Sequence, residues 1–225
     1  MQRTCRARGR TTAVLFALLL AVVLAVAAAV GVSDEAEAHR ASAREQLAEL
    51  RVKPAGSMVG YSREKFPHWS DAREYNWTLP SGTPDPGSCD ARDAALIRDG
   101  RDEVVGSGCY VERGRWFDPY TGKTYYMPSD IDVDHVVPLA NAWRSGASSW
   151  TTVKRERFAN VPMDVLSVED NANASKGDKG PEAWKPPRAA YHCTYARKWI
   201  GIKHNWTLSV TGAEKTALSS MLSTC

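Results

Sequence analysis

Residues 130–142 read DIDVDHVVPLANA, and the interpretation of the whole chain starts from this stretch. Carboxylates at every second position, followed by His135 and two valines, alternate as the residues of a short β-strand do. Pro138 lacks a backbone N–H group and ends the strand. The pattern therefore predicts a strand that carries Asp134 and His135 to its own end. A carboxylate there can hold a hard cation, and a neutral imidazole can take a proton from water. The Asp134–His135 pair can therefore form a metal-assisted hydrolytic site.

A second polar segment, residues 170–177, reads DNANASKG, and Asn160 stands before it at the end of a predicted helix. Carboxamide oxygens are neutral, hard ligands, so an Asn added to one Asp can hold Mg²⁺ whose other positions are water and phosphate. Helix capping and turn formation also use Asn, and they explain this run better when it is taken alone. The segment gains meaning only in combination with the strand that contains His135.

Residues 1–38 have the layout of a secretory signal peptide. Four arginines precede an uninterrupted apolar run over residues 13–32, and Ala36-Glu37-Ala38 offers small residues at a cleavage site. A membrane anchor is the alternative, because about 20 apolar residues are enough to cross a bilayer. Either interpretation predicts that the remainder is secreted or extracytoplasmic, and membrane-anchored only if residues 13–32 are retained.

The cysteines fit an oxidising compartment. Cys5 would leave with the signal, and four remain: Cys89, Cys109, Cys193 and Cys225. An even set in an exported chain implies two disulfides, and three pairings are possible. We expect the pairs that close local loops, Cys89–Cys109 and Cys193–Cys225. A zinc site is the competing interpretation, but no two cysteines have CxxC spacing.

Charge is unevenly distributed along the exported part. Residues 150–210 carry ten Lys and Arg against six Asp and Glu, whereas residues 39–149 carry fourteen against sixteen. A basic half behind an acidic motif suits an anionic substrate such as a phosphodiester backbone. An ordinary solvated surface explains an imbalance of this size equally well.

The order of predicted elements indicates a mixed α+β domain, with strands first and helices after them. Residues 39–51 predict a short peripheral helix, and residues 161–168 an apolar connection. Strands are expected at residues 104–111, 115–118 and 123–127, before the strand that contains His135. Helices are expected from Asp90, at residues 140–145, 150–160, 170–176 and 191–203, and after the capping box that starts at Thr211.

Together, DHVVPL at residues 134–139, Asn160 and NASKG at residues 173–177 resemble the HNH (ββα-metal) nuclease superfamily. Within it, the chain resembles exported HNH endonuclease family proteins with the DUF1524 type of domain. The resemblance extends from about Cys89 to Cys225, and includes the DPYTG turn and the Pro-Pro loop. It implies an α+β fold in which small antiparallel strands and helices are built around a ββα-metal motif. Asn173 stands where the superfamily's name implies His.

This resemblance implies a metal-dependent phosphodiesterase. His135 would be the general base, and Asp134 and Asn173 would hold one divalent ion, Mg²⁺ or Mn²⁺, against the scissile phosphate. Asn160 would orient His135 through its second ring nitrogen or through the adjacent backbone. Neighbouring residues of a regular strand point to opposite faces, so Asp134 and His135 can share a site only at a strand end or a bulge.

Lys176 and Lys179 would contact substrate phosphates as point charges. The expected organisation is a signal or anchor over residues 1–38, an N-terminal extension and linker over 39–88, and an HNH-type nuclease domain over 89–225. We expect a monomer that acts on nucleic acid, DNA rather than RNA, although no base-reading motif separates the two. A ribonuclease and a non-catalytic exported surface or partner-binding protein on the same fold are the alternatives.

Overall fold

The structure is a computed structural model, and it describes residues 42–80 and 89–225. Ala43–Cys225 form one compact unit. The predicted signal or anchor over residues 1–38 lies outside the described residues. Among the residues that are described, no helix has the length and apolar character needed to span a bilayer.

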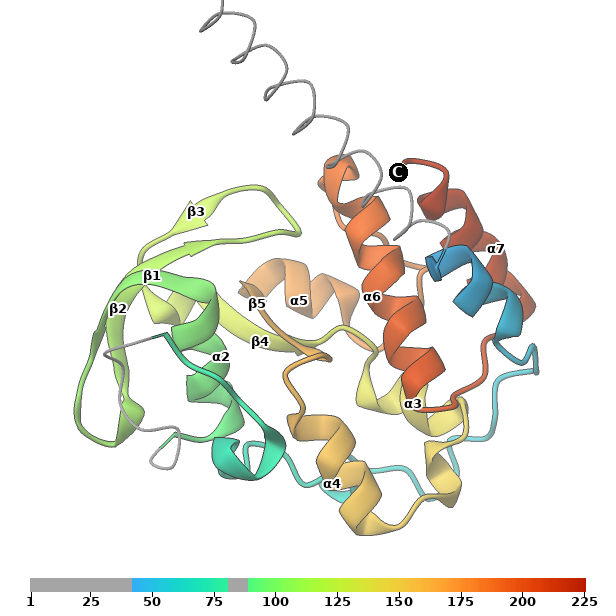
Figure 1. Cartoon of the computed structure of the whole chain (residues 1–225), viewed down its shortest axis with the longest axis horizontal. Coiled ribbons are helices and arrows are strands. Elements are labelled where there is room, and N and C mark those ends of the chain that lie inside the picture. The colour runs from blue at the N-terminus through green and yellow to red at the C-terminus, as the bar shows by residue number, and fades with distance from the viewer. Residues whose placement is uncertain (1–41, 81–88) are drawn as a thin grey trace, which may run out of the picture. The chain divides into compact units, whose positions relative to one another are not determined.

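A three-stranded antiparallel sheet with the order β1-β2-β3 follows helix α2 in the chain. Its strands are β1 Gly100–Val105, β2 Val111–Phe117 and β3 Thr124–Tyr125. Helix α2, Ala91–Asp99, begins at Asp90, whose carboxylate accepts a hydrogen bond from the Asp93 amide, and it packs against β1 and β2 (Figure 1). The helix start agrees with the sequence-based expectation, and β2 and β3 overlap the strands expected at residues 115–118 and 123–127. The strand expected over residues 104–111 is wrong, because this stretch holds the end of β1, the 3-10 turn Ser107–Cys109 and only the first residue of β2.

A second sheet contains the motif from which the sequence interpretation started. Strand β4, Ile131–His135, pairs antiparallel with β5, Val165–Glu169, and the helix that follows at once, α5 Asp170–Lys176, packs against both (Figure 1). Strand β4 carries Asp134 and His135 at its end as predicted, but it ends at His135, three residues before Pro138, where the sequence predicts the end. Strand β5 lies where only an apolar connection is expected from the sequence, because Val165-Leu166-Ser167-Val168 has no clean alternation of apolar and polar residues.

The remaining helices follow the predicted order, and α6 and α7 pack against each other (Figure 1). They are α3 Leu139–Arg144, α4 Thr152–Asn160, α6 His192–Asn205 and α7 Gly212–Leu222. Thr211 and Glu214 form both hydrogen bonds of the predicted capping box at the start of α7. Small antiparallel sheets surrounded by helices confirm the mixed α+β class.

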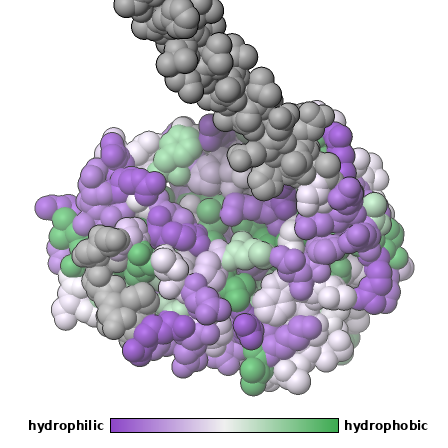
Figure 2. Space-filling view, viewed as in Figure 1, coloured by the Kyte–Doolittle hydropathy of each residue, from purple (hydrophilic) through white to green (hydrophobic). Residues whose placement is uncertain are grey.

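Two hydrophobic clusters form the core, and the β4–β5 pair contributes to both. Ile131 and Val165 belong to the cluster beneath α2, whereas Val136 and Val168 belong to the larger cluster around α6. The strand end that carries His135 therefore lies where the two clusters meet. Hydrophilic side chains cover most of the face seen in Figure 2, with apolar residues in small separate areas.

The chain is helical over residues 42–49, and this helix is not peripheral. Its apolar residues Ala43 and Leu47 are buried in the larger cluster. The sequence gives a weak indication of this because only a few apolar residues stand among charged ones.

Both disulfides pair as expected. Cys89 is bonded to Cys109 with a Cα–Cα distance of 5.1 Å, and Cys193 is bonded to Cys225 with a Cα–Cα distance of 5.2 Å. The first joins the start of α2 to the connection between β1 and β2. The second joins the first turn of α6 to the chain end beyond α7.

Candidate active site

A cleft of about 300 Å³ opens at the end of β4, and it is called the β4 cleft below. Three of the predicted site residues line it together: Asp134, His135 and Asn173. Arg63 and Asp178 also line it, and the sequence pattern predicts a role for neither. The strand end and α5 thus bring together residues that lie about 40 positions apart in the chain.

His135 is held in one tautomer. Its Nε2 lies 2.7 Å from the carbonyl oxygen of Ala159, and because a carbonyl only accepts, Nε2 carries the proton and donates. Nδ1 therefore holds a lone pair, and no described residue forms a hydrogen bond with it. Burial lowers the pKa of His135 to about 3, and the nearby positive charge of Arg63 acts in the same direction. The imidazole is consequently neutral at ordinary pH.

Two aromatic side chains from the segment before residue 90, His68 and Trp69, pack against this imidazole. The Trp69 indole stacks on it with ring centroids 5.5 Å apart and an interplanar angle of 21°. The His68 ring lies nearly perpendicular to it, with ring centroids 6.5 Å apart. Trp69 has a φ of +62°, a left-handed conformation that a bulky residue seldom adopts. Such conformations persist where the surroundings impose them, often at functional sites.

Arg63 brings a cation to the cleft from the short 3-10 helix Arg63–Lys65. Its Nε donates to His68 Nε2 at 3.2 Å, and His68 Nδ1 in turn donates to the carbonyl of Phe66. The guanidinium is exposed, so its two terminal nitrogens can still bind an anion. Residues 61–77 contain many aromatic and basic residues without periodicity, and nothing in that pattern identifies Arg63.

Asp134 forms the floor of the cleft and is tied on both sides. Its Oδ1 accepts from Lys176 Nζ at 2.8 Å, and its Oδ2 accepts from the Tyr120 hydroxyl at 2.7 Å. Burial raises the pKa of Asp134, while Lys176 and Tyr120 oppose that shift. The carboxylate has only 6 % of its side-chain surface exposed.

Lys176 differs from its predicted role as a phosphate contact. Its side chain has no exposed surface, and its ammonium group also donates to the carbonyl of His135 at 2.9 Å. The reason is geometric: Lys176 stands four residues after the buried Ala172 and shares the inward face of α5. Lys179 is exposed outside the β4 cleft, where its ammonium group donates to the carbonyl of Ser175.

Asn173 faces the cleft from α5. Its Nδ2 donates to Asp132 Oδ2 at 3.2 Å, which leaves the carboxamide oxygen without a hydrogen-bond partner among the described residues. The same residues contain no group of three or more His, Cys, Asp or Glu that could hold a metal ion. One free carboxamide oxygen beside a carboxylate whose oxygens each keep a further lone pair fits a weakly held, water-rich Mg²⁺, and it does not fit zinc.

Asn160 affects the site indirectly, through the backbone segment that carries Trp69. Its side chain accepts from the Ser70 amide and donates to the carbonyls of Pro67 and Glu156, so it fixes the segment that carries Trp69 against α4. The backbone carbonyl of the neighbouring residue, Ala159, accepts the hydrogen bond from His135 Nε2. The hydrogen bonds of the Asn160 side chain go to Ser70, Pro67 and Glu156 and not to the imidazole.

Asp164 holds the backbone just after His135, and the sequence gives no signal for it. Its carbonyl accepts from the Val136 amide, and its Oδ1 accepts from the Val137 amide, each at 2.8 Å. The side chain is fully buried, and burial raises its pKa well above the usual range. These bonds turn the chain at the end of β4, which lets Asp134 and His135 reach one cleft.

Comparison with known proteins gives two findings. The model of a family described as the C-terminal domain of GmrSD restriction endonucleases matches residues 90–221. A protein of Arthroderma benhamiae with the name "Uncharacterized secreted protein" is 48 % identical over 186 residues, which cover 82 % of this chain and 85 % of that protein. Residues 90–225 are too few to supply all those positions, so the similarity extends into the segment before residue 90. No solved structure matches the chain.

Proposed function

This chain belongs to the family of the C-terminal domain of GmrSD restriction endonucleases, and from that premise we propose a specific function. It is an exported endonuclease that hydrolyses phosphodiester bonds of nucleic acid, with His135 as the general base. The observation that carries the proposal is the unprotonated Nδ1 of a neutral imidazole in one cleft with Asp134, Asn173 and the exposed cation of Arg63.

The proposed reaction begins with a water molecule beside His135. As the water oxygen attacks phosphorus, its proton passes to Nδ1, and the P–O bond to the leaving oxygen breaks with its electron pair staying on that oxygen, which takes a proton from solvent water. The imidazolium keeps its Nε2–H bond to the Ala159 carbonyl and then returns its extra proton to solvent. Trp69 stacks on the ring and limits its rotation, which keeps Nδ1 directed at one place. Arg63 contacts a non-bridging phosphate oxygen and stabilises the charge that develops there.

A divalent ion, Mg²⁺ or Mn²⁺, completes this proposal. Asn173 Oδ1 and the Asp134 carboxylate would hold it, with Asp132 near the same rim. When bound, the ion supplies Lewis-acid stabilisation of the phosphate and of the leaving oxygen. Because only one of the two ligands is charged, we expect little metal in the free protein and a requirement for it during cleavage.

We assign the segment β4–β5–α5 to the ββα-metal motif of the HNH superfamily. Two antiparallel strands followed by a helix, with the base at the end of the first strand and the Asn ligand on the helix, support this assignment. In this proposal Lys176 does not contact the substrate. Its buried ammonium group instead donates to both Asp134 and the His135 carbonyl and holds them in place.

The name of the Arthroderma relative supports the proposed export, as do the two disulfides. DNA is the proposed substrate, and a ribonuclease is the alternative on the same site. A non-catalytic binding protein would have no need for a neutral imidazole held in one tautomer.

The test is incubation of the exported chain with plasmid DNA and with RNA, in Mg²⁺, Mn²⁺ or EDTA. We expect cleavage with metal only, and a loss of about two to four orders of magnitude in rate for His135→Ala. His204→Ala on the surface of α6 is the matched control and should retain the rate.

Metal binding is tested separately by calorimetric titration. Asp134→Asn and Asn173→Ala should weaken both metal affinity and plasmid nicking, whereas Asn173→Asp adds a carboxylate and should tighten metal binding. Normal cleavage by Asp134→Asn, or activity that survives EDTA, would contradict the proposed metal site. Full activity of a folded His135→Ala variant would remove the base.

A further inference from the structure

A second concave surface lies apart from the β4 cleft, and we call it the basic groove. It has a volume of about 460 Å³ and is lined by four cationic side chains with no carboxylate among its lining residues. The four cations are Arg51, Lys53, Arg144 and Lys154. They come from three separate parts of the chain: the segment after the helix over residues 42–49, helix α3 and helix α4.

Most of this positive charge is not neutralised. Within the described residues, no ion pair joins Lys53, Lys154 or Arg51 to a carboxylate. Arg51 donates to the Thr207 carbonyl, and Lys154 lies over the Trp150 ring at 4.4 Å. Only Arg144 is paired, with Asp178 at 3.0 Å. Clustered cations on a concave wall concentrate the positive potential and attract a polyanion.

The groove also has an aromatic wall. Trp150 and Trp206 both line it, with their ring centroids 5.5 Å apart. Both indoles are partly exposed. Flat aromatic surfaces beside a row of cations are the arrangement that binds a nucleic-acid strand, since bases stack on rings and phosphates contact the cations. An acidic peptide would use the cations and leave the rings without a partner.

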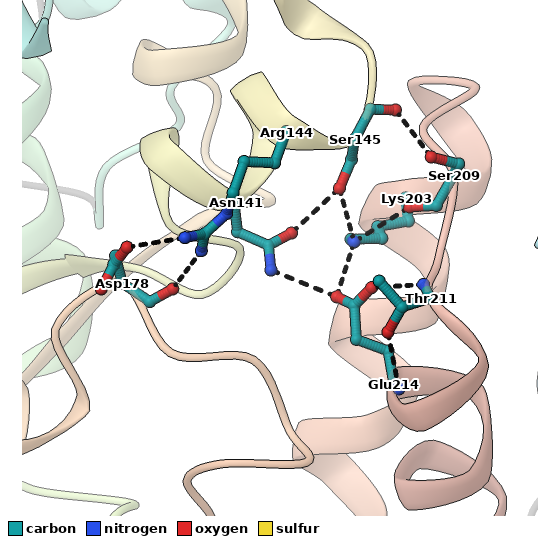
Figure 3. A network of polar contacts seen from close by, with 8 residues as sticks. All are labelled: Asn141, Arg144, Ser145, Asp178, Lys203, Ser209, Thr211 and Glu214. Carbon is teal, nitrogen blue, oxygen red and sulfur yellow. Dashed lines mark hydrogen bonds and ion pairs between the residues drawn. The ribbon is translucent and has the colours of Figure 1, made fainter. Parts of the chain in front are cut away.

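The basic groove and the β4 cleft both border a third pocket that lies between them. A pocket of about 310 Å³ shares Lys53 and Arg144 with the groove and Asp178 with the cleft, and Lys179 lines it as well. In Figure 3 the Arg144 side chain extends toward Asp178, whereas Glu214 is directed at Lys203 and Asn141.

The one buried acid of this connecting pocket is thereby neutralised. The Lys203 ammonium lies 2.7 Å from the Glu214 carboxylate, and neither side chain has more than 2 % of its surface exposed. The path from the cleft to the groove therefore presents Arg144, Lys179 and Lys53 to a bound strand without a free carboxylate of Glu214 opposing it. The two exposed acids of this pocket are Asp178, which is paired with Arg144, and Glu182. The buried Lys203–Glu214 ion pair thus keeps the Glu214 charge from repelling a polyanion in this pocket.

We propose that the basic groove binds the phosphodiester backbone of the same nucleic-acid strand whose scissile phosphate lies in the β4 cleft. This inference rests on the proposed nuclease function and adds a substrate subsite to it. Phosphates contact Lys53 and Lys154, and a base packs against Trp150. The groove sets affinity for long strands, and the β4 cleft performs the chemistry.

The experiment measures binding without cleavage. A fluorescein-labelled DNA oligonucleotide, single-stranded or duplex, is titrated with the exported chain in EDTA and followed by anisotropy. The double variant Lys53→Glu/Lys154→Glu should raise the Kd at least ten-fold. Arg113→Glu/Lys123→Glu makes the same charge change on β2 and in the turn before β3, and it should stay within two-fold of the unchanged protein. The slope of log K against log salt should fall by about 0.7 per lost phosphate contact for the single strand.

A small chromogenic phosphodiester, bis(4-nitrophenyl) phosphate, separates the two proposals because it is too short to reach the groove. With Mg²⁺, the ratio of plasmid nicking to hydrolysis of this diester should fall at least ten-fold in the groove variant. An unchanged Kd in a folded groove variant overturns the inference, whatever the activity. If the unchanged protein hydrolyses neither substrate but the groove variant loses DNA binding, the nuclease proposal fails and the groove remains a nucleic-acid surface.

Discussion

At the scale of single residues, the pair Asp134–Lys176 shows that the proposed catalytic motif also has a structural role. Lys176 donates to the Asp134 carboxylate, which lines the cleft, and to the backbone carbonyl of His135, the proposed base. A buried charge whose partner is removed is left uncompensated, so each partner needs the other. The sequence motif NxSKG identifies this lysine. Its burial becomes evident only in the structure, where Lys176 lies on the inward face of α5.

The first prediction concerns the energy of that pair. Asp134→Asn and Lys176→Met should each lower the free energy of unfolding by about 3–5 kcal/mol, because each leaves one buried charge unpaired. The double variant should cost less than the sum, with a coupling of about 1–3 kcal/mol. Urea denaturation of the four proteins measures the cycle. The exposed pair Arg115–Asp102, at 3.0 Å, is the control and should couple by less than about 1 kcal/mol. Additive losses at Asp134 and Lys176 would contradict the prediction.

His135 gives a second prediction at this scale, on pH. Its folded pKa is about 3, whereas an unfolded His titrates near 6.5. Between these values the unfolded chain binds a proton that the folded protein does not, so this group makes the fold less stable as pH falls from about 6.5 toward 3. The loss should approach about 1.4 kcal/mol per pH unit and should be absent above about pH 7.

The measurement is urea unfolding of the unchanged protein and of His135→Gln at several pH values. Asp93 and Asp164, whose pKa values are raised by burial, act in the opposite direction in both proteins, so they cancel in the difference. Parallel stability curves for the two proteins below pH 6.5 would show that His135 takes up a proton in the folded state.

At the scale of elements, the sequence predicts most helices and the key strand, since these have clear caps or clean alternation. Strand β4 ends at His135 next to Pro138, and α7 starts at the Thr211 capping box. Strand β5 escapes prediction because its residues are buried on both faces and show no period of two: it is defined by pairing with β4, a contact across some 30 residues. Pairing of this kind is a property of the tertiary structure.

The disulfide between Cys193 and Cys225 carries the element-scale prediction. It ties α6 to the chain end beyond α7, and the two cysteines are separated by 32 positions in the sequence. Cys193→Ala/Cys225→Ala should lower the free energy of unfolding by about 2–4 kcal/mol, because the unfolded chain regains the freedom of that loop. Hydrogen exchange should show faster exchange in α7 than in α5, which packs on β4 and β5. An unchanged unfolding midpoint would mean that packing alone holds α7.

At the scale of the whole molecule, the site crosses the boundary of the family-matched region. Residues 90–221 supply the proposed base, the proposed metal ligands and the buried lysine, but the segment before them supplies Arg63, His68 and Trp69. The sequence assigns residues 39–88 to an extension and linker because they carry no motif and no periodicity. Their role depends on Asn160, which binds the backbone of Ser70 and Pro67 and so brings a distant segment to the imidazole.

The last prediction tests whether this segment takes part in the chemistry. Arg63→Ala should lower kcat/KM for plasmid cleavage by about 10- to 100-fold, or about 1.4–2.7 kcal/mol, because a phosphate oxygen loses its charged donor. Lys65→Ala, an exposed cation in the same 3-10 helix, should change it little. Arg63 also lowers the pKa of His135, so its removal leaves an imidazole that protonates more readily, and the remaining activity should fall off at a higher pH. If a folded Arg63→Ala variant has full activity and an unshifted pH profile, Arg63 takes no part in the reaction, and the mechanism involves only residues 90–221. Loss of rate with that shift would make the preceding segment a working part of the active site, because a merely structural contact predicts neither change.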